Sequence, residues 1–569
     1  DKVRWWMGIP FLLTLLFMAH PIHTEVVANI KGRDEIMALL FLLGGMIAAF
    51  KYLDAAKAFW LPVAAACFLL AMLSKETPLP FVFILPMAIW FFRKQPLSRM
   101  LLASAPFAAM AIVYLVIRFS VLGLPTMGGT GGQEILNNPF LHATPTERLA
   151  TVVETWGIYL VKLFAPVRLS SDYYFNQIPI TSFSHPMVLA ALAVNLGLLL
   201  LGIWRARKKD PIGFGILFYF ISFSITSNLV VSIGTTMGER FVFIPSMGFL
   251  IAVVFGLHSL ALRLRISERS FQYAMIAVVA VPFAIRTVAR NQAWKDNHTL
   301  FTTDARISTR SAKIRTAAGG VMIERAAGKG ISPKEKNELL HGAITHLRAA
   351  IEIYPEHGTA WILLGNAYHE LKDYQNSLDA YREAIRNRPN LLESYKNAAV
   401  TARKMHQYAL AGAFYKAELD KRRETHAPED ANYWFDRGKN YEDWGSQPDS
   451  AIWAYRTAIQ LDPRKAEAYG QMGRVYGMQL NDLDHAIEYG EKAVALDPKL
   501  DWVFENIGIA YGMKKDYEKS IAAFLNGIRI RPTSGKLYMN LALTYQNMGD
   551  ATRAQAAFAK AFELDPSLK

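Results

Sequence analysis

Long apolar runs alternate with short polar connectors over the first half of the chain. Nine runs approach the length of a membrane-spanning helix, at residues 5–19, 36–53, 59–73, 79–92, 100–117, 186–204, 212–231, 241–262 and 271–285. Several are shorter than the roughly 20 residues that a helix needs to cross a bilayer, so polar ends or a re-entrant path must contribute. The pattern predicts a polytopic helical membrane domain over residues 1–287.

The connectors between these runs differ in charge. Positive residues stay on the cytoplasmic side of a membrane, and they gather here in every second connector: Lys51, Lys57, Arg93, Lys94, Arg99, Arg205, Arg207, Lys208, Lys209, Arg263, Arg265 and Arg269. With nine spans all of them lie on one face, which we expect to be cytoplasmic. The opposite face then receives residues 20–35, 74–78, 119–185 and 234–240, together with the whole chain after residue 287.

One further segment, residues 147–164, is apolar enough to be a tenth span. Glu154 and Lys162 interrupt it, and Trp156 and Tyr159 suit the headgroup zone of a bilayer. We therefore interpret it as an interfacial helix. The alternative stays open, and a tenth span would translocate the later basic clusters.

The second half of the chain is periodic. Prolines recur at intervals of 34, 39, 35, 35, 34 and 34 residues, at Pro355, Pro389, Pro428, Pro463, Pro498, Pro532 and Pro566. An aromatic residue stands six positions after each of the first six, and a Gly or Ala stands ten positions after, where paired helices need close approach. This spacing is typical of tetratricopeptide repeats. We expect about six repeats over residues 332–569, after a connector at 288–331, and interpret the aromatic positions as core.

Composition and charge narrow the function classes. The formal net charge of +14 would suggest nucleic acid in a soluble protein, but the connector clusters account for it through membrane orientation, so no nucleic-acid partner is expected. Cys67 is the only cysteine and excludes an intramolecular disulfide or a cysteine metal site. The glycine-rich run at 127–134 lacks the ending of a phosphate-binding loop.

Ionisable side chains gather in the connectors of the expected non-cytoplasmic face: His20, His23, Glu25, Lys31, Arg33, Asp34, Glu35, Lys75, Glu76, Arg168, Asp172, Glu239 and Arg240. Sugar transfer from a polyprenyl phosphate would need such groups. Fixed cations stabilise the charge that develops on the leaving phosphate, and a carboxylate can take the proton of the acceptor hydroxyl. These groups indicate a functional site because they all lie on the same expected face of the membrane domain.

A structural role remains open for each of these groups. His20 and His23 can end a helix by bonding to backbone, and the charges at 31–35 can form a solvated face. Lys75 and Glu76 can anchor a helix end at the interface. Glu239 can favour a helix N-terminus through the dipole, and Arg240 can snorkel.

Several stretches together resemble a known family. They are HPIHTEVVANIKGRDE (20–35), LSKETP (73–78), NNPF (137–140), LFAPVRLSSDYY (163–174), MGERFVFIPSMGF (237–249) and RNQAWKDNHTLF (290–301), followed by the repeats. In this order they resemble the transmembrane and tetratricopeptide repeat containing proteins, which are similar to protein O-mannosyltransferases of the GT-C superfamily. The resemblance implies an all-α protein, with a GT-C-type membrane domain followed by a tetratricopeptide superhelix.

The function implied is an inverting glycosyltransferase that moves a sugar from a polyprenyl phosphate to Ser or Thr hydroxyls of protein, with the repeats presenting the acceptor. The resemblance also implies a catalytic acidic pair in an outer loop that would precede Asp1, so we expect about two further spans upstream. The supporting residues we assign are, for the donor phosphate, His23, Arg33, Lys75 and Arg240; as carboxylates, Glu25, Asp34, Glu76 and Glu239; and as secondary candidates, His20, Arg168 and Asp172.

The expected setting is a bacterial inner membrane with the repeats in the periplasm, or the endoplasmic reticulum membrane with lumenal repeats in a eukaryote. Expected partners are the donor lipid, an acceptor protein and membrane lipids. No cofactor is assigned, and a role for a divalent metal is left open. The alternative from another class is a non-catalytic membrane scaffold whose repeats recruit proteins.

Overall fold

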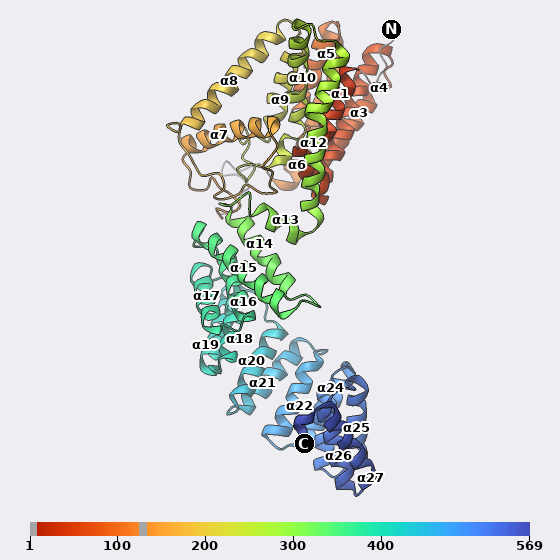
Figure 1. Ribbon diagram of the computed structural model, residues 1–569, viewed down its shortest axis with the longest axis vertical. Helices are drawn as coiled ribbons and strands as arrows, with labels where there is room; N and C mark the ends of the chain where they lie inside the picture. Colours follow the sequence, from red (N-terminus) through yellow and green to blue (C-terminus); the bar gives the residue numbers. More distant parts are fainter. Residues whose placement is uncertain (1–7, 124–133) are drawn as a thin grey trace. The chain divides into compact units, whose positions relative to one another are not determined.

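The computed structural model describes residues 8–123 and 134–569, so the glycine-rich run at 127–134 lies almost wholly outside the described residues. Helices are the only regular structure within those ranges, which confirms the all-α class (Figure 1). The chain forms two compact units, Asp1–Pro355 and Glu356–Lys569.

All nine predicted spans correspond to apolar helices of the first unit. Among the described residues, five helices are long and apolar enough to cross a membrane, three are shorter, and one bent pair adds a possible sixth span. In chain order they are α1 (Ile9–Ala19) bent by 51° against the segment that ends with α2 (Thr24–Ala28), α3 (Arg33–Ala55), α4 (Trp60–Ser74), α5 (Phe81–Phe92), α6 (Leu97–Leu122), α8 (Pro186–Ala206), α9 (Pro211–Phe223), α10 (Pro245–Arg263), and α11 (Glu268–Met275) continuing into α12 (Val281–Asn291).

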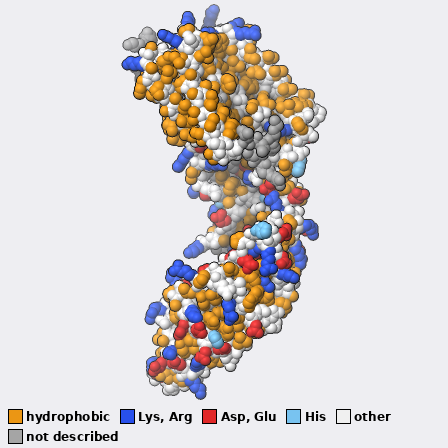
Figure 2. Space-filling model, turned by 180° about the vertical axis from the view of Figure 1, so that it is seen from behind, with side chains coloured by type: hydrophobic (Ala, Val, Ile, Leu, Met, Phe, Trp, Pro, Cys, Tyr) orange, Lys and Arg blue, Asp and Glu red, His pale blue; other side chains and the backbone are white. Residues whose placement is uncertain are grey.

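The outer surface of these helices is apolar. Large side chains on α3, α6, α8 and the α11–α12 segment are each more than half exposed: Leu40, Ile47, Ile112, Val116, Leu196, Leu200, Val278 and Ile285. Figure 2 shows this broad apolar surface, with Lys and Arg side chains at its upper rim. A water-soluble surface does not carry a patch of this size, so the unit is an integral membrane domain.

Contacts between the basic connectors gather them at one end of the unit. Arg93 after α5 pairs with Asp54 near the end of α3 at 3.1 Å. Lys209, between α8 and α9, lies over the ring of Trp90. These contacts fit the nine-span threading, because they join three connectors that the charge pattern assigns to the same face.

Helix α7 (Pro145–Phe164) contains residues 147–164, which the sequence leaves open between an interfacial helix and a tenth span. Thr144 and Glu147 form a reciprocal capping box at its start. One side is buried, including Tyr159 and Leu163, whereas Val161 and Phe164 are exposed. In Figure 1 α7 runs across the direction of α12 and α6, which fits a helix that lies along a membrane surface.

The segment interpreted as a connector is largely helical. It contains α13 (Asn297–Asp304) and α14 (Ala312–Ala326), and α14 packs along α15 (Pro333–Ile353). A Cβ on Gly319 of α14 would lie 2.6 Å from a side-chain carbon of Leu347 on α15. Helix α15, at the start of the region where the repeats are expected, therefore has a partner that the proline spacing does not predict.

The second unit consists of six antiparallel helix pairs, as the repeat spacing predicts. They are α16 (Gly358–Glu370) with α17 (Tyr374–Asn387), α18 (Leu392–Lys404) with α19 (Tyr408–Glu424), α20 (Ala431–Trp444) with α21 (Pro448–Leu461), α22 (Ala466–Gln479) with α23 (Leu483–Leu496), α24 (Asp501–Met513) with α25 (Tyr517–Ile530), and α26 (Gly535–Met548) with α27 (Ala551–Leu564). The long 39-residue interval follows from the longer α19.

The predicted close approach is confirmed in pairs that carry a glycine at this position. A Cβ on Gly365 would lie 2.5 Å from Tyr381, and a Cβ on Gly438 would lie 2.5 Å from Tyr455. Such distances leave no room for a methyl group. Of the six aromatic positions interpreted as core, Tyr395 and Trp434 are buried, whereas the other four are partly buried: Trp361, Tyr469, Phe504 and Tyr538.

Gly438→Ala is therefore expected to destabilise the second unit by about 1–3 kcal/mol, the usual cost of overpacking. Gly412→Ala in α19 is the matched control, because its Cβ would meet Asn440 only at 3.8 Å. There the better helix propensity of Ala should stabilise by up to about 1 kcal/mol. Chemical denaturation measures the change in the free energy of unfolding of each variant. Destabilisation of equal size at both positions would contradict the packing argument.

Candidate functional site

The bend after α1 is built around two buried histidines. Pro21 begins the short turn Pro21–His23. His20 Nε2 lies 3.0 Å from the carbonyl oxygen of Leu163. His23 Nδ1 lies 2.7 Å from the carbonyl oxygen of Phe17, and its Nε2 contacts a serine hydroxyl on α10 at 2.9 Å. Because protein groups engage these nitrogens in the interior, we leave both histidines out of the proposed donor site.

Glu25 and Arg240 form the central ion pair of this end of the unit. The Arg240 guanidinium donates from Nη1 to Glu25 Oε1 at 2.7 Å, and the backbone N–H of Arg240 donates to Oε2 at 3.0 Å. Glu25 is 3% exposed, whereas the Arg240 side chain is 33% exposed. Glu25 thus orients the guanidinium, which forms one side-chain hydrogen bond among the described residues, through Nη1, and stays partly exposed.

Glu239 faces away from this pair, into a buried network. Its Oε1 accepts from the Ser170 N–H at 2.8 Å and from the Tyr173 hydroxyl. Lys162 of α7 donates to that hydroxyl at 3.0 Å. Burial raises the pKa of Glu239 to about 7, and the charge of Lys162 partly opposes this shift. Glu239 therefore holds the loop 165–185 in position and does not face solvent.

Tyr159 fixes the turn that carries both residues. Its hydroxyl donates to the carbonyl of Gly238 at 3.0 Å and accepts from the N–H of Gly238 at 2.9 Å. Tyr159 is 2% exposed. A single buried side chain of α7 thereby satisfies both backbone groups directly before Glu239 and Arg240.

Asp172 lies near the Glu25–Arg240 pair, whose charges both act on it. Its Oδ1 accepts from the Tyr174 N–H at 2.6 Å. Burial raises the pKa of Asp172 to about 7, and the Tyr174 hydrogen bond only partly opposes this. The carboxyl group is thus able to exchange a proton near neutral pH.

The raised pKa of Asp172 predicts a pH-dependent stability. The folded protein holds this proton more tightly than the unfolded chain, whose ordinary pKa is 3.8, so stability falls as pH rises from about 4 to about 7. Asp172→Asn removes the titration, and its melting temperature should drop less than that of the wild type between pH 5 and pH 8. Asp54→Asn, at an exposed pair, is the control and should retain the full drop. An equal drop in Asp172→Asn would contradict the assignment.

A second charged cluster joins the start of α3 to the connector between α4 and α5. Lys75 Nζ lies 2.9 Å from Asp34 and 3.2 Å from Glu35. The Thr77 hydroxyl donates to Glu35 at 2.8 Å. Both carboxyl groups lie against the Lys75 ammonium, so Lys75 is poorly suited to bind a phosphate. Glu76 instead lies 3.8 Å from Arg118 in an exposed pair.

Two further candidates point outward. Arg33 and Arg168 are exposed, and no ion pair joins either side chain to another described residue. The structure therefore brings together Glu25, Asp172, Glu239 and Arg240 in one group and Asp34, Glu35 and Lys75 in another.

Sequence reasoning missed the residues that hold the first group in place. Arg290 of α12 binds Asp304 of α13 through two hydrogen bonds of 2.6 and 3.1 Å, and Asp304 also accepts from the Ser171 N–H at 2.7 Å. Both charges are buried. The available signal was the position of Arg290 at the start of the last family-like stretch. Within the described ranges no group of three His, Cys, Asp or Glu could hold a metal ion.

Fold and site define a helical membrane protein with a tetratricopeptide repeat array and a polar centre at one end of its membrane domain. Residues 335–391, 466–500 and 535–568 match the tetratricopeptide repeat family. The solved structure of YrrB, a tetratricopeptide repeat protein, is 21% identical with a TM-score of 0.28, over 34% of this chain and 95% of that chain.

Relatives extend the similarity into the membrane domain. The mouse protein O-mannosyl-transferase TMTC3 is 25% identical over 516 residues, which covers 82% of this chain and 53% of the relative. Human protein O-mannosyl-transferase TMTC1 is 25% identical over 396 residues, covering 63% and 43%. The chain spans about half the length of the curated relatives it matches. These matches confirm the resemblance to the transmembrane and tetratricopeptide repeat containing proteins.

Proposed function

We propose that this protein transfers a sugar, mannose by analogy with its relatives, from a polyprenyl phosphate to Ser or Thr hydroxyls of an acceptor protein. The observation that carries the proposal is the Arg240 guanidinium, which Glu25 fixes at the polar end of a membrane domain and which stays partly exposed. The relatives named as protein O-mannosyl-transferases support the reaction class.

The chemistry follows from this geometry. The acceptor hydroxyl oxygen bonds to the anomeric carbon and gives up its proton to a carboxylate base, while the bond from that carbon to the phosphate oxygen breaks and the electron pair stays on the phosphate. Arg240 would stabilise this growing charge, since guanidinium binds phosphate oxygens in a forked geometry. Asp172, which titrates near neutral pH, would accept a hydrogen bond from a sugar or acceptor hydroxyl.

The proposal puts the polar centre and the repeats on the same, non-cytoplasmic side of the membrane. The repeats would then hold the acceptor segment, in keeping with the extended binding surfaces of stacked helix pairs. A reporter enzyme fused after residue 569 tests this arrangement, and a cytoplasmic readout would overturn it.

Transfer is tested with the protein in liposomes, a polyprenyl-phosphate mannose donor and Ser/Thr-containing peptides. The expected result is a peptide mass increase of one hexose that depends on both substrates. The repeat array itself favours one other function, a membrane scaffold that recruits proteins. Protein partners captured by the repeats, with no hexose added under any donor, would favour the scaffold.

A further inference from the structure

A row of unpaired cations follows the spans. Between Asp304 and Glu324 the chain carries four basic residues and no acidic one, and we call them the basic row: Arg306, Arg310, Lys313 and Arg315. Arg306 and Arg310 are exposed, and the other two are partly buried. None of the four side chains forms an ion pair with another residue that the structure describes.

The position of two of these cations disfavours the local structure. Ser311 caps α14 by accepting a hydrogen bond from the Ile314 N–H, so Lys313 and Arg315 lie at the start of the helix. The positive end of the helix dipole repels cations there, and the first turn holds no acidic residue to offset them. Residues that break a local rule without a structural gain are expected at functional positions.

Hydrogen bonds fasten the basic row to the loop that carries Asp172. The Arg310 N–H donates to the Gln177 side chain at 3.0 Å, and the Arg310 carbonyl accepts from the Asn176 N–H at 3.0 Å. The Ser308 hydroxyl donates to the carbonyl of Asp172 at 2.9 Å. These bonds engage the backbone of Arg310 and leave its guanidinium exposed beside the loop.

One end of the basic row reaches the polar centre. The Lys313 ammonium lies 3.9 Å from the centre of the Tyr174 ring, and the charges of Lys313 and Arg240 both act on Asp172. The Tyr174 N–H donates to Asp172 Oδ1 at 2.6 Å. A cation of α14 thus joins the guanidinium of the membrane domain around one carboxyl group.

The other end of the basic row lies against α15. Arg315 donates from Nη1 to His346 Nδ1 at 3.1 Å. Burial and the charges of Arg315 and Arg306 lower the pKa of His346, so the imidazole is neutral at neutral pH and offsets no charge. Helix α15 is the last helix before the repeats, so the basic row occupies the chain between the polar centre and the repeat array.

The distribution of the charges restricts what the basic row can bind. Cations spread over residues 306–315 suit several anionic groups along an extended partner, whereas a single phosphate needs donors that converge on it. A flat layer of lipid headgroups reaches exposed side chains, but Lys313 and Arg315 are partly buried. An acidic segment of polypeptide fits this row best.

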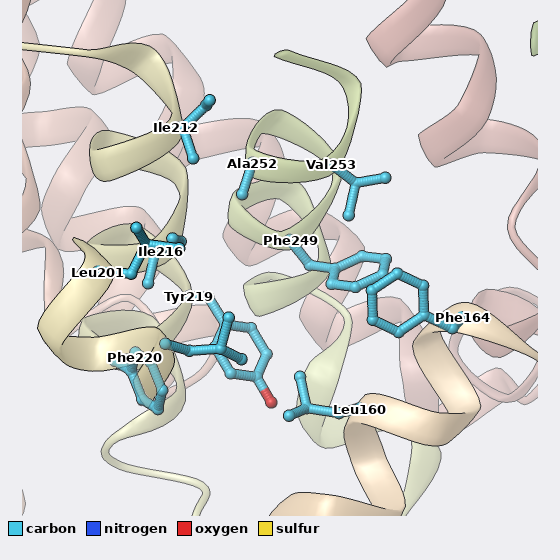
Figure 3. A pocket seen from close by; sticks show the side chains of 11 residues that line it. Leu160, Phe164, Leu201, Ile212, Ile216, Tyr219, Phe220, Phe249, Ala252 and Val253 are labelled. Carbon is cyan, nitrogen blue, oxygen red and sulfur yellow. The ribbon is translucent and has the colours of Figure 1, made fainter. Parts of the chain in front are cut away.

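The membrane domain offers no comparable charge in its pocket between α7, α8, α9 and α10. The side chains that line this pocket are apolar apart from one tyrosine hydroxyl, that of Tyr219 (Figure 3). An acidic segment that approaches the polar centre therefore finds matching charge along the basic row and not in this pocket.

We infer that the basic row binds acidic side chains next to the Ser or Thr that receives the sugar, so that the protein selects acidic acceptor segments. The inference rests on the proposed function, because that function places a substrate hydroxyl at Asp172, beside Lys313. Clusters of Arg recognise acidic motifs in other peptide-binding proteins. The preference should weaken as salt is raised, since exposed charges are screened.

Peptide binding tests the inference without sugar transfer. The full chain in phosphatidylcholine nanodiscs is titrated with two labelled peptides that carry either Asp or Asn residues after a central Thr. The wild type should bind the Asp peptide about tenfold more tightly, as expected of a few exposed ion pairs. Arg306→Glu combined with Arg310→Glu should abolish this preference and favour a peptide with Lys at the same positions.

Lys329→Glu combined with Lys334→Glu is the matched control. It makes the same change in net charge at exposed positions beyond the other end of α14, and it should keep the preference of the wild type. Because Arg306 and Arg310 are exposed, their charge-reversed variant should keep the melting temperature of the wild type.

Equal binding of the Asp and Asn peptides by the wild type would overturn the inference, as would an unchanged preference in Arg306→Glu with Arg310→Glu. Loss of the preference when phosphatidylglycerol replaces part of the phosphatidylcholine would also overturn it, since lipid headgroups would then occupy the basic row.

Hexose transfer to the same peptides tests the proposed function separately. The charge-reversed variant should raise the KM for the Asp peptide and leave transfer to the Asn peptide unchanged. No transfer to either peptide by the wild type, with the binding preference intact, would remove the transferase proposal and leave the basic row supported as a site for acidic peptides.

Discussion

Arg240→Ala is expected to lower the rate of sugar transfer by about 10² to 10³, the loss typical of removing one preorganised donor to a developing charge. The guanidinium is held at 2.7 Å by Glu25 and is only partly exposed. It therefore needs little reorganisation as the phosphate leaves. Hexose transfer to peptide under saturating donor measures the effect.

The same substitution leaves Glu25 buried without its cationic partner, with only the backbone N–H of residue 240 still bonded to it, which destabilises the fold independently of catalysis. The double variant Arg240→Ala with Glu25→Gln separates the two effects, because it removes the buried charge as well. We expect its melting temperature to return toward that of the wild type while transfer stays low. Recovery of transfer together with stability would show that Arg240 acts only through folding.

Arg290→Ala is expected to destabilise the first unit by about 3–5 kcal/mol, the usual cost of removing one partner from a buried pair. Asp304 would remain buried and charged, and its hold on the Ser171 N–H at 2.7 Å would loosen. Denaturation of the detergent-solubilised protein measures stability, and hydrogen exchange over residues 165–185 measures the loop.

Arg93→Ala is the matched control for this experiment. The Arg93–Asp54 pair is exposed, at 38% and 55%, and such pairs contribute about 0–1 kcal/mol. Equal effects of Arg290→Ala and Arg93→Ala would show that the buried pair does not position the loop.

Most of the fold could be predicted because its determinants are periodic. Each predicted apolar run lies on an apolar helix, because a segment in lipid must satisfy its backbone hydrogen bonds within itself. Proline spacing predicted six helix pairs, and the glycines at 365 and 438 predicted where helices meet. The partner of α15 was missed, because α14 precedes the first proline marker and carries no repeat signature.

The candidate site could be predicted only in part. Grouping the connectors by face placed Glu25 of the first connector with Arg240 of the short turn before α10, and these two residues form an ion pair. The direction of each side chain could not be predicted, because it depends on tertiary partners. Glu239 and Arg240 are adjacent, yet one enters a buried network and the other stays partly exposed. Asp304, far along the chain, gave no local signal for its role.

The double hydrogen bond of Tyr159 to Gly238 has a mechanical consequence. It ties the helix that crosses the direction of the spans to the turn that carries the guanidinium, so the two move as one body. With α7 at the membrane surface, as its sequence predicts, its depth in the lipid would set the height of that positive charge above the hydrocarbon. Under the proposed function, the bilayer would then help to position the donor-phosphate site.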